Sequence, residues 1–514
     1  MSDTALDTIK KLEEIDLLPS PESSSSPKTR DNLKSLGEQL AGQKSRSAIS
    51  RTVLIGLIRG LEFSVIMSTG FVSFILWQDL ETQTSFHDLL LIVSVPLLCL
   101  LVFQALEVNE ISAFRLPLEQ CLKIGLTWSL IFLTPVLMYL TTPEFLETSN
   151  WQAGWFVLGG LSLILSRLFT GLIVNYFNRN GRLNRRTVVV GGGVHAEMVL
   201  QNLMKQKGSD LQIYGFFDDR ADERSTDVIA GFPKLGNVDE LVAFGRHTHI
   251  DLIIFALPIT AEMRILQMLR KLWVLPSDIR LAAHGNKLRF RPRSYSYVGD
   301  MPVLDVVDRP IADWDVIKKS IFDRVIGFLI LVALSPLMLL IALAVRLDSP
   351  GPIFFRQKRY GFNNQVINIF KFRSLYKDKE DVTGAQQVTR TDSRVTRVGR
   401  ILRKSSLDEL PQLFNVVCYG NLSLVGPRPH TLTAQIQNRA YEVVVDGYFA
   451  RHRVRPGMTG WAQINGWRGE TDTLEKIQRR VEHDLYYIEN WSIGLDLYIL
   501  ARTPLALIKH DNAY

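Results

Sequence analysis

Four long apolar stretches occupy the first third of the chain. They are residues 52–77, 89–106, 121–140 and 155–176. Each is close to the ~20 residues with which an α-helix crosses the hydrocarbon core of a bilayer. The pattern therefore predicts a transmembrane α-helical bundle of four spans over residues 51–177.

Charges around these stretches predict their orientation. Basic residues precede the first stretch and four arginines between positions 179 and 186 follow the fourth, whereas the connecting loops are acidic or neutral. Because positive flanks stay in the cytoplasm, both ends of the bundle are expected on that side. Glu62 is the charge expected within a span, and Arg59 is its neighbour on the helix, which permits simple pairing. Such an apolar bundle is typical of an anchor and disfavours a lipid flippase, which needs polar groups in its interior.

The residues before the bundle have a different character. Residues 1–50 are polar and include the serine run Ser23–Ser26. They lack the short apolar core that a cleavable signal peptide carries after its charges. We expect a disordered N-terminal tail.

After Arg186 the pattern changes to short β-branched runs that alternate with helical ones. Strands are expected at Thr187–Val190, Gln212–Phe217, Ile250–Phe255 and Ile279–Leu281. Strands that alternate with helices indicate parallel βαβ units. The prediction is a Rossmann-like α/β domain over residues 184–305.

A glycine-rich turn follows the first of these strands. Gly191 and Gly193 begin a G-x-G-x-x-A match, and Asp218 ends the second strand. In a strand-turn-helix context this pattern predicts cofactor binding, with a nucleotide pyrophosphate held at the helix N-terminus. A tight turn that binds no ligand explains the same residues equally well. No tyrosine in the chain is followed four positions later by lysine, which disfavours short-chain reductase or dehydratase chemistry.

A second kind of apolar run extends from about Val325 to Val345 and is interrupted by Ser335-Pro336. A straight fifth span is one interpretation, because proline is tolerated in membrane helices. Basic residues flank both ends of the run, and the positive-inside bias then favours both ends on the cytoplasmic side. We therefore expect a re-entrant helix-break-helix over residues 321–347, in which Ser335 satisfies a carbonyl that Pro336 leaves free.

Composition agrees with a chain that is partly in lipid and partly in water. Hydrophobic residues make up 46% of the chain and charged residues 22%, with a net charge of +7. The three cysteines lie in apolar surroundings without a C-x-x-C pair, which excludes the common zinc and redox motifs. At 514 residues, several modules are expected.

Adjacent carboxylates at Asp408 and Glu409 are the strongest candidates for chemistry. Pro411 places a helix start near Asp408, and Gly420 marks its end. On local grounds the pair could be a helix cap. Many cations lie near it in sequence, however, and guanidinium forks match phosphate oxygens. These cations are Lys371, Arg373, Arg390, Arg394, Arg397, Arg400, Arg403 and Arg428.

The adjoining membrane hairpin makes a lipid phosphate the expected target, in preference to nucleic acid. Phosphoryl transfer needs a nucleophile, a hard divalent cation on carboxylate oxygens and cations around the transferred group. Asp408 and Glu409 with Mg²⁺ and the arginines meet these needs. A carboxylate at a helix N-terminus stays ionised and can act as the nucleophile.

Several motifs of the last two hundred residues occur in one order. They are Ser335-Pro336, Lys371 to Ser374, Thr391 to Arg394, Val398 to Arg400, Ser406 to Asn415, Gly426 to Pro429 and Arg455 to Trp461. Together they resemble the α-rich catalytic domain of bacterial polyprenyl-phosphate glycosylphosphotransferases, the monotopic phosphoglycosyltransferases. With the four spans and the Rossmann-like module, the whole chain resembles the large members, the undecaprenyl-phosphate glucose phosphotransferases.

This resemblance implies a function for residues 315–514. The aspartate aligned with Asp408 attacks a UDP-sugar, releases UMP and holds a phospho-sugar that undecaprenyl phosphate then takes. It implies Mg²⁺, held by Asp408 and Glu409, a site in the bacterial inner membrane facing the cytoplasm, and a role at the start of exopolysaccharide or capsule synthesis. Glucose rests on the resemblance, with galactose as the alternative. The expected phosphate ligands are Lys371, Arg373, Arg394, Arg400, Arg428 and Arg455.

A second class of function stays open beside the enzyme. The Gly191–Ala196 turn and the anchor bundle are also compatible with a membrane-tethered, nucleotide-binding regulator of polysaccharide export. A Rossmann-like domain on a membrane bundle also permits a homodimer.

Overall fold

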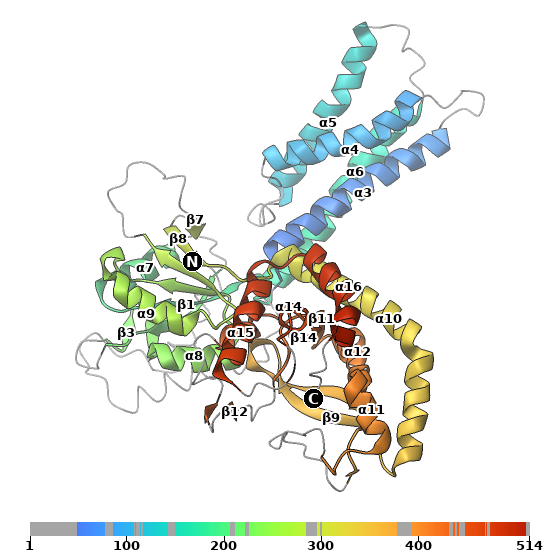
Figure 1. The fold of residues 1–514 in the computed structure, drawn as a ribbon. Helices are drawn as coiled ribbons and strands as arrows, with labels where there is room; N and C mark the ends of the chain where they lie inside the picture. The colour runs from blue at the N-terminus through green and yellow to red at the C-terminus, as the bar shows by residue number, and fades with distance from the viewer. Residues whose placement is uncertain are drawn as a thin grey trace. The chain divides into compact units, whose positions relative to one another are not determined.

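The computed structural model divides the chain into two compact units, Arg46–Asn184 and Arg185–Tyr514 (Figure 1). The described residues are 49–77, 86–106, 108, 114, 117–141, 150–205, 211–220, 226–283, 296–298, 301–377, 392–430, 435–436, 439–440, 448–467, 469 and 473–509. Nearly all of the predicted N-terminal tail, together with Arg390 and Thr391, lies outside these residues.

The first unit has a helix over each of the four apolar stretches. These helices are α3 (Arg51–Trp77), α4 (Phe86–Ala105), α5 (Pro117–Thr141) and α6 (Asn150–Arg179). Among the described helices, α3, α4, α6 and the later α10 are long and apolar enough to cross a membrane. The chain is therefore a membrane protein.

Large aromatic side chains fill the space between these helices. The Trp155 indole donates a hydrogen bond to the Ile66 carbonyl at 3.1 Å, and Trp128 donates to the Phe156 carbonyl at 2.9 Å. Gly70 and Gly159 lie against these rings, where a Cβ would come within 2.8 Å of an indole atom. Small residues thus let the helices approach closely, as membrane packing requires.

Glu62 has a buried partner that the sequence pattern did not predict. Glu62 pairs with Arg167 of α6 at 2.8 Å, and the two side chains are only 2% and 3% exposed. Arg167 is a second charge within a predicted span that the sequence pattern did not single out. A charge in an apolar bundle is stable when a partner neutralises it, and only the packing of α3 on α6 supplies that partner.

An eight-stranded sheet forms the α/β domain. Its predicted parallel strands are confirmed as β1 (Arg185–Val190), β2 (Leu211–Phe217), β5 (Leu252–Phe255) and β6 (Asp278–Ala282). Four further strands were not predicted, and the strand order is β3-β4-β2-β1-β5-β6-β8-β7. They are β3 (Val228–Ile229), β4 (Phe232–Gly236), β7 (Ser296–Val298) and β8 (Met301–Val307).

The sheet is mixed and not purely parallel. Helix α7 (Val194–Lys205) covers one face, while α8 (Val238–His247) and α9 (Glu262–Leu272) cover the other. Because both faces of the central strands are buried, those strands are apolar at successive positions and were easy to predict. β8 pairs antiparallel with β6 and has a partly exposed face, so its signal is weaker.

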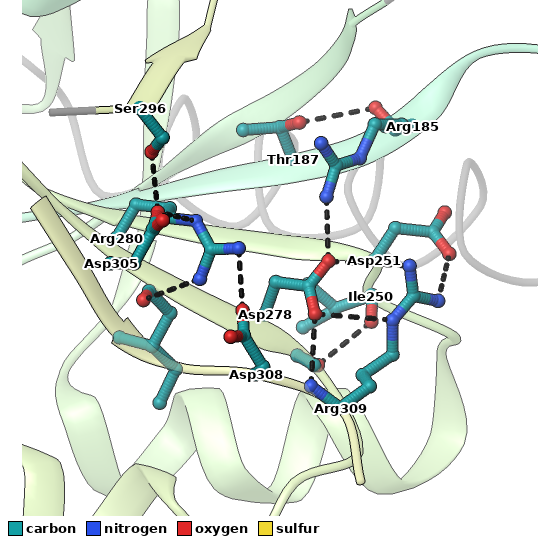
Figure 2. Close-up of polar contacts among 12 residues, drawn as sticks. Arg185, Thr187, Ile250, Asp251, Asp278, Arg280, Ser296, Asp305, Asp308 and Arg309 are labelled. Carbon is teal, nitrogen blue, oxygen red and sulfur yellow. Dashed lines mark hydrogen bonds and ion pairs between the residues drawn. The ribbon is translucent and has the colours of Figure 1, made fainter. Parts of the chain in front are cut away.

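Ion pairs fasten the amino ends of the sheet strands (Figure 2). Arg185, at the start of β1, pairs with Asp278 at 2.6 Å. Arg309, in the segment that leaves the sheet, contacts Asp278 at 3.3 Å and Asp251 at 3.4 Å. The point where the chain leaves the sheet for the catalytic domain is thereby fixed to the starts of β5 and β6.

Helix α10 (Asp313–Asp348) contains the predicted membrane break. It continues through Pro336 as one helix of 36 residues that bends along its length (Figure 1). The Ser335 hydroxyl donates to the Val332 carbonyl at 2.8 Å, which is the carbonyl that Pro336 leaves without its amide partner. The predicted role of Ser335 is confirmed, whereas the predicted interruption between two separate helices is a bend within one helix.

Both halves of α10 pack on the catalytic domain. Ile326 and Ile330 join the core around Leu413 and Leu424, and Met338 and Ile341 join a second cluster with Leu402. The remaining face of the helix exposes large apolar side chains. These are Ile321, Val325, Phe328, Leu329, Val332, Leu337, Leu339, Leu340, Leu343 and Leu347.

The rest of the catalytic domain surrounds a small mixed core. Its strands form the hairpin of β9 (Phe354–Tyr360) and β10 (Val366–Phe372), the pair of β11 (Ser423–Val425) and β14 (Gly457–Thr459), and the two-residue pair of β12 (Gln435–Ile436) and β13 (Arg439–Ala440). Its helical elements include α11 (Arg397–Ser405), the 3₁₀ segment η9 (Tyr448–Arg453), α14 (Trp461–Ile464), α15 (Leu474–Glu489) and α16 (Ile493–Lys509).

A buried lysine ties α10 and α16 to this core. The Lys319 ammonium of α10 donates to Asp496 of α16 at 2.6 Å and to the Val425 carbonyl of β11 at 3.1 Å. Val425 immediately precedes the Gly426–Pro429 motif. The position of that motif relative to α10 is therefore fixed by a direct contact.

Gly399 tests the packing of α11. A Cβ at this position would meet the Ser374 backbone, with the carbonyl carbon at 2.8 Å, and backbone atoms cannot yield as a side chain does. We expect Gly399→Ala to destabilise the domain by about 1–3 kcal/mol, which lowers the thermal unfolding midpoint. The matched control is Gly494→Ala, whose nearest neighbour is Ser492 at 3.8 Å. Equal midpoints for the two variants would contradict this packing.

Candidate active site

The two candidate carboxylates lie at the start of an irregular helical segment. Ser406 ends α11 in the left-handed conformation with φ 57°, and a 3₁₀ turn, η7 (Leu407–Glu409), follows at once. One α-helical turn and a π-helical turn continue the segment until Gly420, whose φ of 63° ends it. The predicted helix limits near Asp408 and at Gly420 are thus confirmed.

Asp408 is a buried carboxylate without a hydrogen-bond donor among the residues that the structure describes. Its exposed fraction is 7%. Burial raises the pKa of Asp408, Lys371 opposes this change, and the charge of Glu409 adds to it. The oxygens of Asp408 are therefore not engaged by any described donor.

Glu409 has the opposite environment. Lys371 donates to its Oε1 at 2.9 Å, and Arg428 donates to Oε1 at 2.6 Å and to Oε2 at 3.1 Å. Burial alone would raise the pKa of Glu409, but Arg428 and Lys371 outweigh burial and lower it. Two neighbouring carboxylates with opposite shifts are typical of sites where each has its own task.

Arg428 projects from a loop whose backbone is held at several points. The Gly426 amide donates to the Thr459 carbonyl at 2.8 Å, and the Gly457 amide donates to the Pro427 carbonyl at 2.9 Å. These bonds join the loop to β14. A Cβ on Gly457 would meet the Gly426 backbone, with Cα at 2.6 Å, so glycine is needed for this approach.

Lys371 reaches the same site from the hairpin. It lies near the end of β10, opposite Phe355 of β9. Asn415, which is fully buried, accepts from the Phe370 amide at 2.9 Å and donates to the Asn368 carbonyl at 2.8 Å. The helical segment that carries Asp408 is thereby bonded to the strand that carries Lys371.

The other predicted phosphate ligands do not gather at this point. Arg373 was expected to bind phosphate, but it is 1% exposed and donates to the carbonyls of Ser349 at 2.6 Å and Pro350 at 2.7 Å. Its guanidinium therefore fixes the turn after α10. The buried guanidinium is already hydrogen-bonded to backbone oxygens and is not available to a phosphate. The motif Lys371–Ser374 alone could not reveal this.

Three further arginines occupy separate places. Arg394 pairs with Asp392 at 2.7 Å, and its hydrogen bonds lower the pKa of Asp392 to about 2. Arg400 is exposed on α11. Arg455 is half-buried near Asp323 and Arg324, and burial lowers its pKa. Phosphate binding by these three residues stays a prediction.

Sequence reasoning missed residues that act behind the site. Arg359 donates to the Pro429 carbonyl at 3.3 Å, and burial together with the charge of Arg428 lowers its pKa to about 10. Arg451 donates to the Arg428 carbonyl at 2.8 Å. Both residues bind backbone from distant positions, so neither motif nor spacing identifies them.

Comparison with known proteins gives this arrangement a family. Residues 314–510 match the family model described as bacterial sugar transferase. An undecaprenyl-phosphate glucose phosphotransferase of Komagataeibacter xylinus is 37% identical over 80% of this chain and 75% of its own length. A UDP-glucose:undecaprenyl-phosphate glucose-1-phosphate transferase of Escherichia coli is 36% identical over 71% of this chain and 76% of its own length.

The chain belongs to the bacterial sugar transferase family.

A shorter relative separates the modules of this sugar transferase. An exopolysaccharide production protein of Rhizobium leguminosarum is 45% identical over 200 residues, which are 39% of this chain and 100% of that protein. The resemblance inferred from the motifs is thus confirmed by relatives that span most of the chain and by one of about the size of the catalytic domain.

A second match of the transferase covers α5 and α6 of the bundle together with β1 to β6 of the α/β domain. Residues 104–283 match the family model described as a CoA-binding domain. Gly191 and Gly193 have φ angles of 120° and 71°, as the predicted turn requires. The carboxylate of Asp218, 2% exposed, lies directly against Gly192, and Arg220 lies beside Gly193. In this conformation the turn is covered by a carboxylate of its own, and binding of an anionic ligand there stays a prediction.

Metal binding by the transferase has two candidate ligands. Among the described residues no group of three or more His, Cys, Asp and Glu side chains could hold a metal ion. Mg²⁺ commonly uses one or two carboxylates and completes its shell with water and substrate phosphates. Asp408 and Glu409 fit that pattern, with Asp408 offering oxygens that no described donor uses.

Opposite effects on stability are expected at the two carboxylates. Asp408→Asn removes a buried charge whose ionisation costs free energy in the folded state, so the thermal unfolding midpoint should equal or exceed that of the wild type. Glu409→Gln leaves Arg428 and Lys371 without their counter-charge and should cost roughly 1–3 kcal/mol. Thermal unfolding of the purified variants at neutral pH gives the comparison. A larger loss in Asp408→Asn than in Glu409→Gln would refute these assignments.

Proposed function

We propose that this sugar transferase moves glucose-1-phosphate from UDP-glucose to undecaprenyl phosphate. The products are UMP and undecaprenyl-diphosphate-glucose, and the reaction is the first membrane step of exopolysaccharide or capsule synthesis. The observation that carries the proposal is a buried carboxylate without a described donor beside a second one held by two cations, in a domain of the sugar transferase family. The names of the relatives supply the donor and the acceptor.

Asp408 is the proposed nucleophile. One of its oxygens forms a bond to the β-phosphorus of UDP-glucose while the bond from that phosphorus to the oxygen of UMP breaks. An oxygen of undecaprenyl phosphate then attacks the same phosphorus and displaces Asp408. A carboxylate that accepts no hydrogen bond is the more reactive nucleophile. This supports Asp408 over Glu409, whose oxygens accept from Lys371 and Arg428.

Lys371, Glu409 and Arg428 form the proposed electrostatic partner of this step. Two cations share one carboxylate, so the group as a whole carries a positive charge beside Asp408. That charge favours the phosphates of the donor and stabilises the negative charge on the transferred phosphoryl oxygens. Glu409 has the task of orienting the two cations.

Mg²⁺ is part of the proposal as the cation of the donor diphosphate. Asp408 and Glu409 would hold it together with phosphate oxygens, and when bound it would neutralise the charge of the leaving UMP. The relatives at 36–37% identity carry glucose in their names, which makes galactose the weaker donor.

We further propose that α10 enters and leaves the same leaflet of the inner membrane, with the catalytic domain on the cytoplasmic face. Two observations support this topology. Both halves of α10 pack on one domain, and the opposite face exposes apolar residues along its length. A straight helix of 36 residues would be about 54 Å long and would separate its ends by more than the hydrocarbon core.

The modules before α10 have a supporting role in this proposal. The Rhizobium relative aligns over its whole length with 200 residues of this chain, which is about the length of the catalytic domain. Anchoring, assembly into a homodimer or regulation through the Gly191 turn are therefore functions that these modules add to the transfer reaction. A regulator without enzyme activity is disfavoured by the site itself.

UMP release tests the reaction. The purified full-length protein with UDP-glucose, undecaprenyl phosphate and Mg²⁺ should release UMP, and Asp408→Asn should abolish release while it stays folded. With UDP-glucose alone, the wild type should gain the mass of a hexose phosphate and the variant should not. UMP release that persists in Asp408→Asn would rule out this nucleophile.

Cysteine labelling tests the topology. The labelling variant carries Leu347→Cys in a background with Cys418 replaced by serine. Leu347 lies at the C-terminal end of α10, and its side chain is 77% exposed. The introduced cysteine should react with a membrane-impermeant maleimide in inverted vesicles and not in intact spheroplasts. Lys404→Cys on exposed α11 is the control for the catalytic side. Labelling of Leu347→Cys from the periplasm would show that α10 spans the membrane.

A further inference from the structure

Arg451 is a buried arginine outside the predicted site. It lies in η9 (Tyr448–Arg453), and its exposed fraction is 1%. Asp484 of α15 forms an ion pair with it at 2.6 Å. Burial of a guanidinium costs free energy, and a buried ion pair often contributes little net stability. The position of Arg451 therefore calls for a role beyond stability.

The contacts of Arg451 lead directly to the active-site loop. Its guanidinium donates to the Arg428 carbonyl at 2.8 Å and lies 2.9 Å from Nδ1 of His430, two residues further along the same loop. Burial and the neighbouring Arg451 charge lower the pKa of His430, so its neutral ring can accept a hydrogen bond from the guanidinium. The Tyr448 hydroxyl holds the same ring nitrogen at 2.6 Å.

Backbone chemistry makes the Arg428 carbonyl an effective point of control. Pro427 and Pro429 flank Arg428 and have fixed φ angles and no amide hydrogen. The Arg428 carbonyl is thus a main polar backbone group through which a neighbouring residue can hold this position. The Arg428 side chain makes both bonds to Glu409. A rotation of this peptide would move the whole guanidinium fork.

We propose that Arg451, held by Asp484, is a positioning residue for the transfer reaction. It fixes the Arg428 backbone so that the Arg428 side chain meets Glu409 and the donor phosphate together. Arg451 touches neither carboxylate and acts through Arg428. This role rests on the proposed function of the site.

Neighbouring residues in η9 supply a matched control. Arg453 is also a largely buried arginine that donates to a backbone carbonyl, that of Asp308, at 2.6 Å. Asp308 lies in the segment between β8 and α10 and not in the active-site loop. Arg453→Lys is therefore the same chemical change in the same segment, but the backbone that Arg453 holds lies outside the active-site loop.

A double-mutant cycle tests the proposal in the full-length protein. Arg451→Lys keeps the charge beside Asp484 but lacks the fork that reaches two partners. It should lower kcat/KM for UDP-glucose by about 10- to 100-fold, as a displaced catalytic group does, whereas Arg453→Lys should change it less than about threefold. In an Arg428→Lys background, Arg451→Lys should add less than about a threefold further loss. The thermal midpoints of Arg451→Lys and Arg453→Lys should be similar.

Each alternative outcome has a defined meaning. Losses that multiply in the double variant, or equal losses in Arg451→Lys and Arg453→Lys, would overturn the positioning role and indicate a general structural one. If Arg451→Lys does not fold, Asp484→Asn takes its place, and the same non-additivity with Arg428→Lys is required of it. A wild type that releases no UMP would refute the proposed function itself, whereas an active wild type with independent losses refutes only the role of Arg451.

Discussion

Glu409 and its two cations are the interaction on which the catalytic domain depends. Lys371 comes from the end of a β-hairpin, Arg428 from a proline-bounded loop and Glu409 from a 3₁₀ turn, so one carboxylate joins three elements that are distant in sequence. Lys371 and Arg428 thus balance the charge of Glu409 and occupy its oxygens. The adjacent Asp408 is the carboxylate whose oxygens no described donor occupies. Identical functional groups on successive residues thereby acquire different chemistry.

Backbone hydrogen bonds support this cluster. The loop with Arg428 is bonded to β14, to Arg359 and to Arg451, and the strand with Lys371 is bonded to Asn415. Phosphoryl transfer depends chiefly on alignment and charge, so a site built for it benefits from groups that cannot drift. The buried charges behind the loop are explained by this need for alignment.

A second constraint follows from the proposed function, in which one substrate is soluble and the other is a lipid. Helix α10 answers it with a face that packs on the catalytic domain and a face of exposed apolar residues. Lys319 on that helix bonds to the carbonyl of Val425, one residue before Gly426. The exposed apolar face of α10 and the loop that carries Arg428 are therefore joined by a direct contact, as the proposed function requires.

Local patterns determined much of this protein. The lengths of apolar runs predicted four helices of the first unit, the continuous apolar strands predicted the centre of the sheet, and Pro411 with Gly420 predicted the limits of the segment after Asp408. These features depend on residues close together in the chain, because burial and backbone preference act at each position. The motifs also identified the family.

Tertiary structure decided which charges meet. Arg373 and Lys371 are two residues apart, yet one fixes the turn after α10 and the other holds Glu409. β10 ends at Phe372, so the rule that places residues two apart on one face of a strand does not extend to Arg373. Glu62 pairs with Arg167 across two helices, and Arg451 reaches Arg428 from 23 residues away. Pro336 bends α10 without ending it, since Ser335 and the packing of both halves compensate for the lost hydrogen bond. Pairing of charges across the fold is a property of distances in space, and the order of residues along the chain does not contain it.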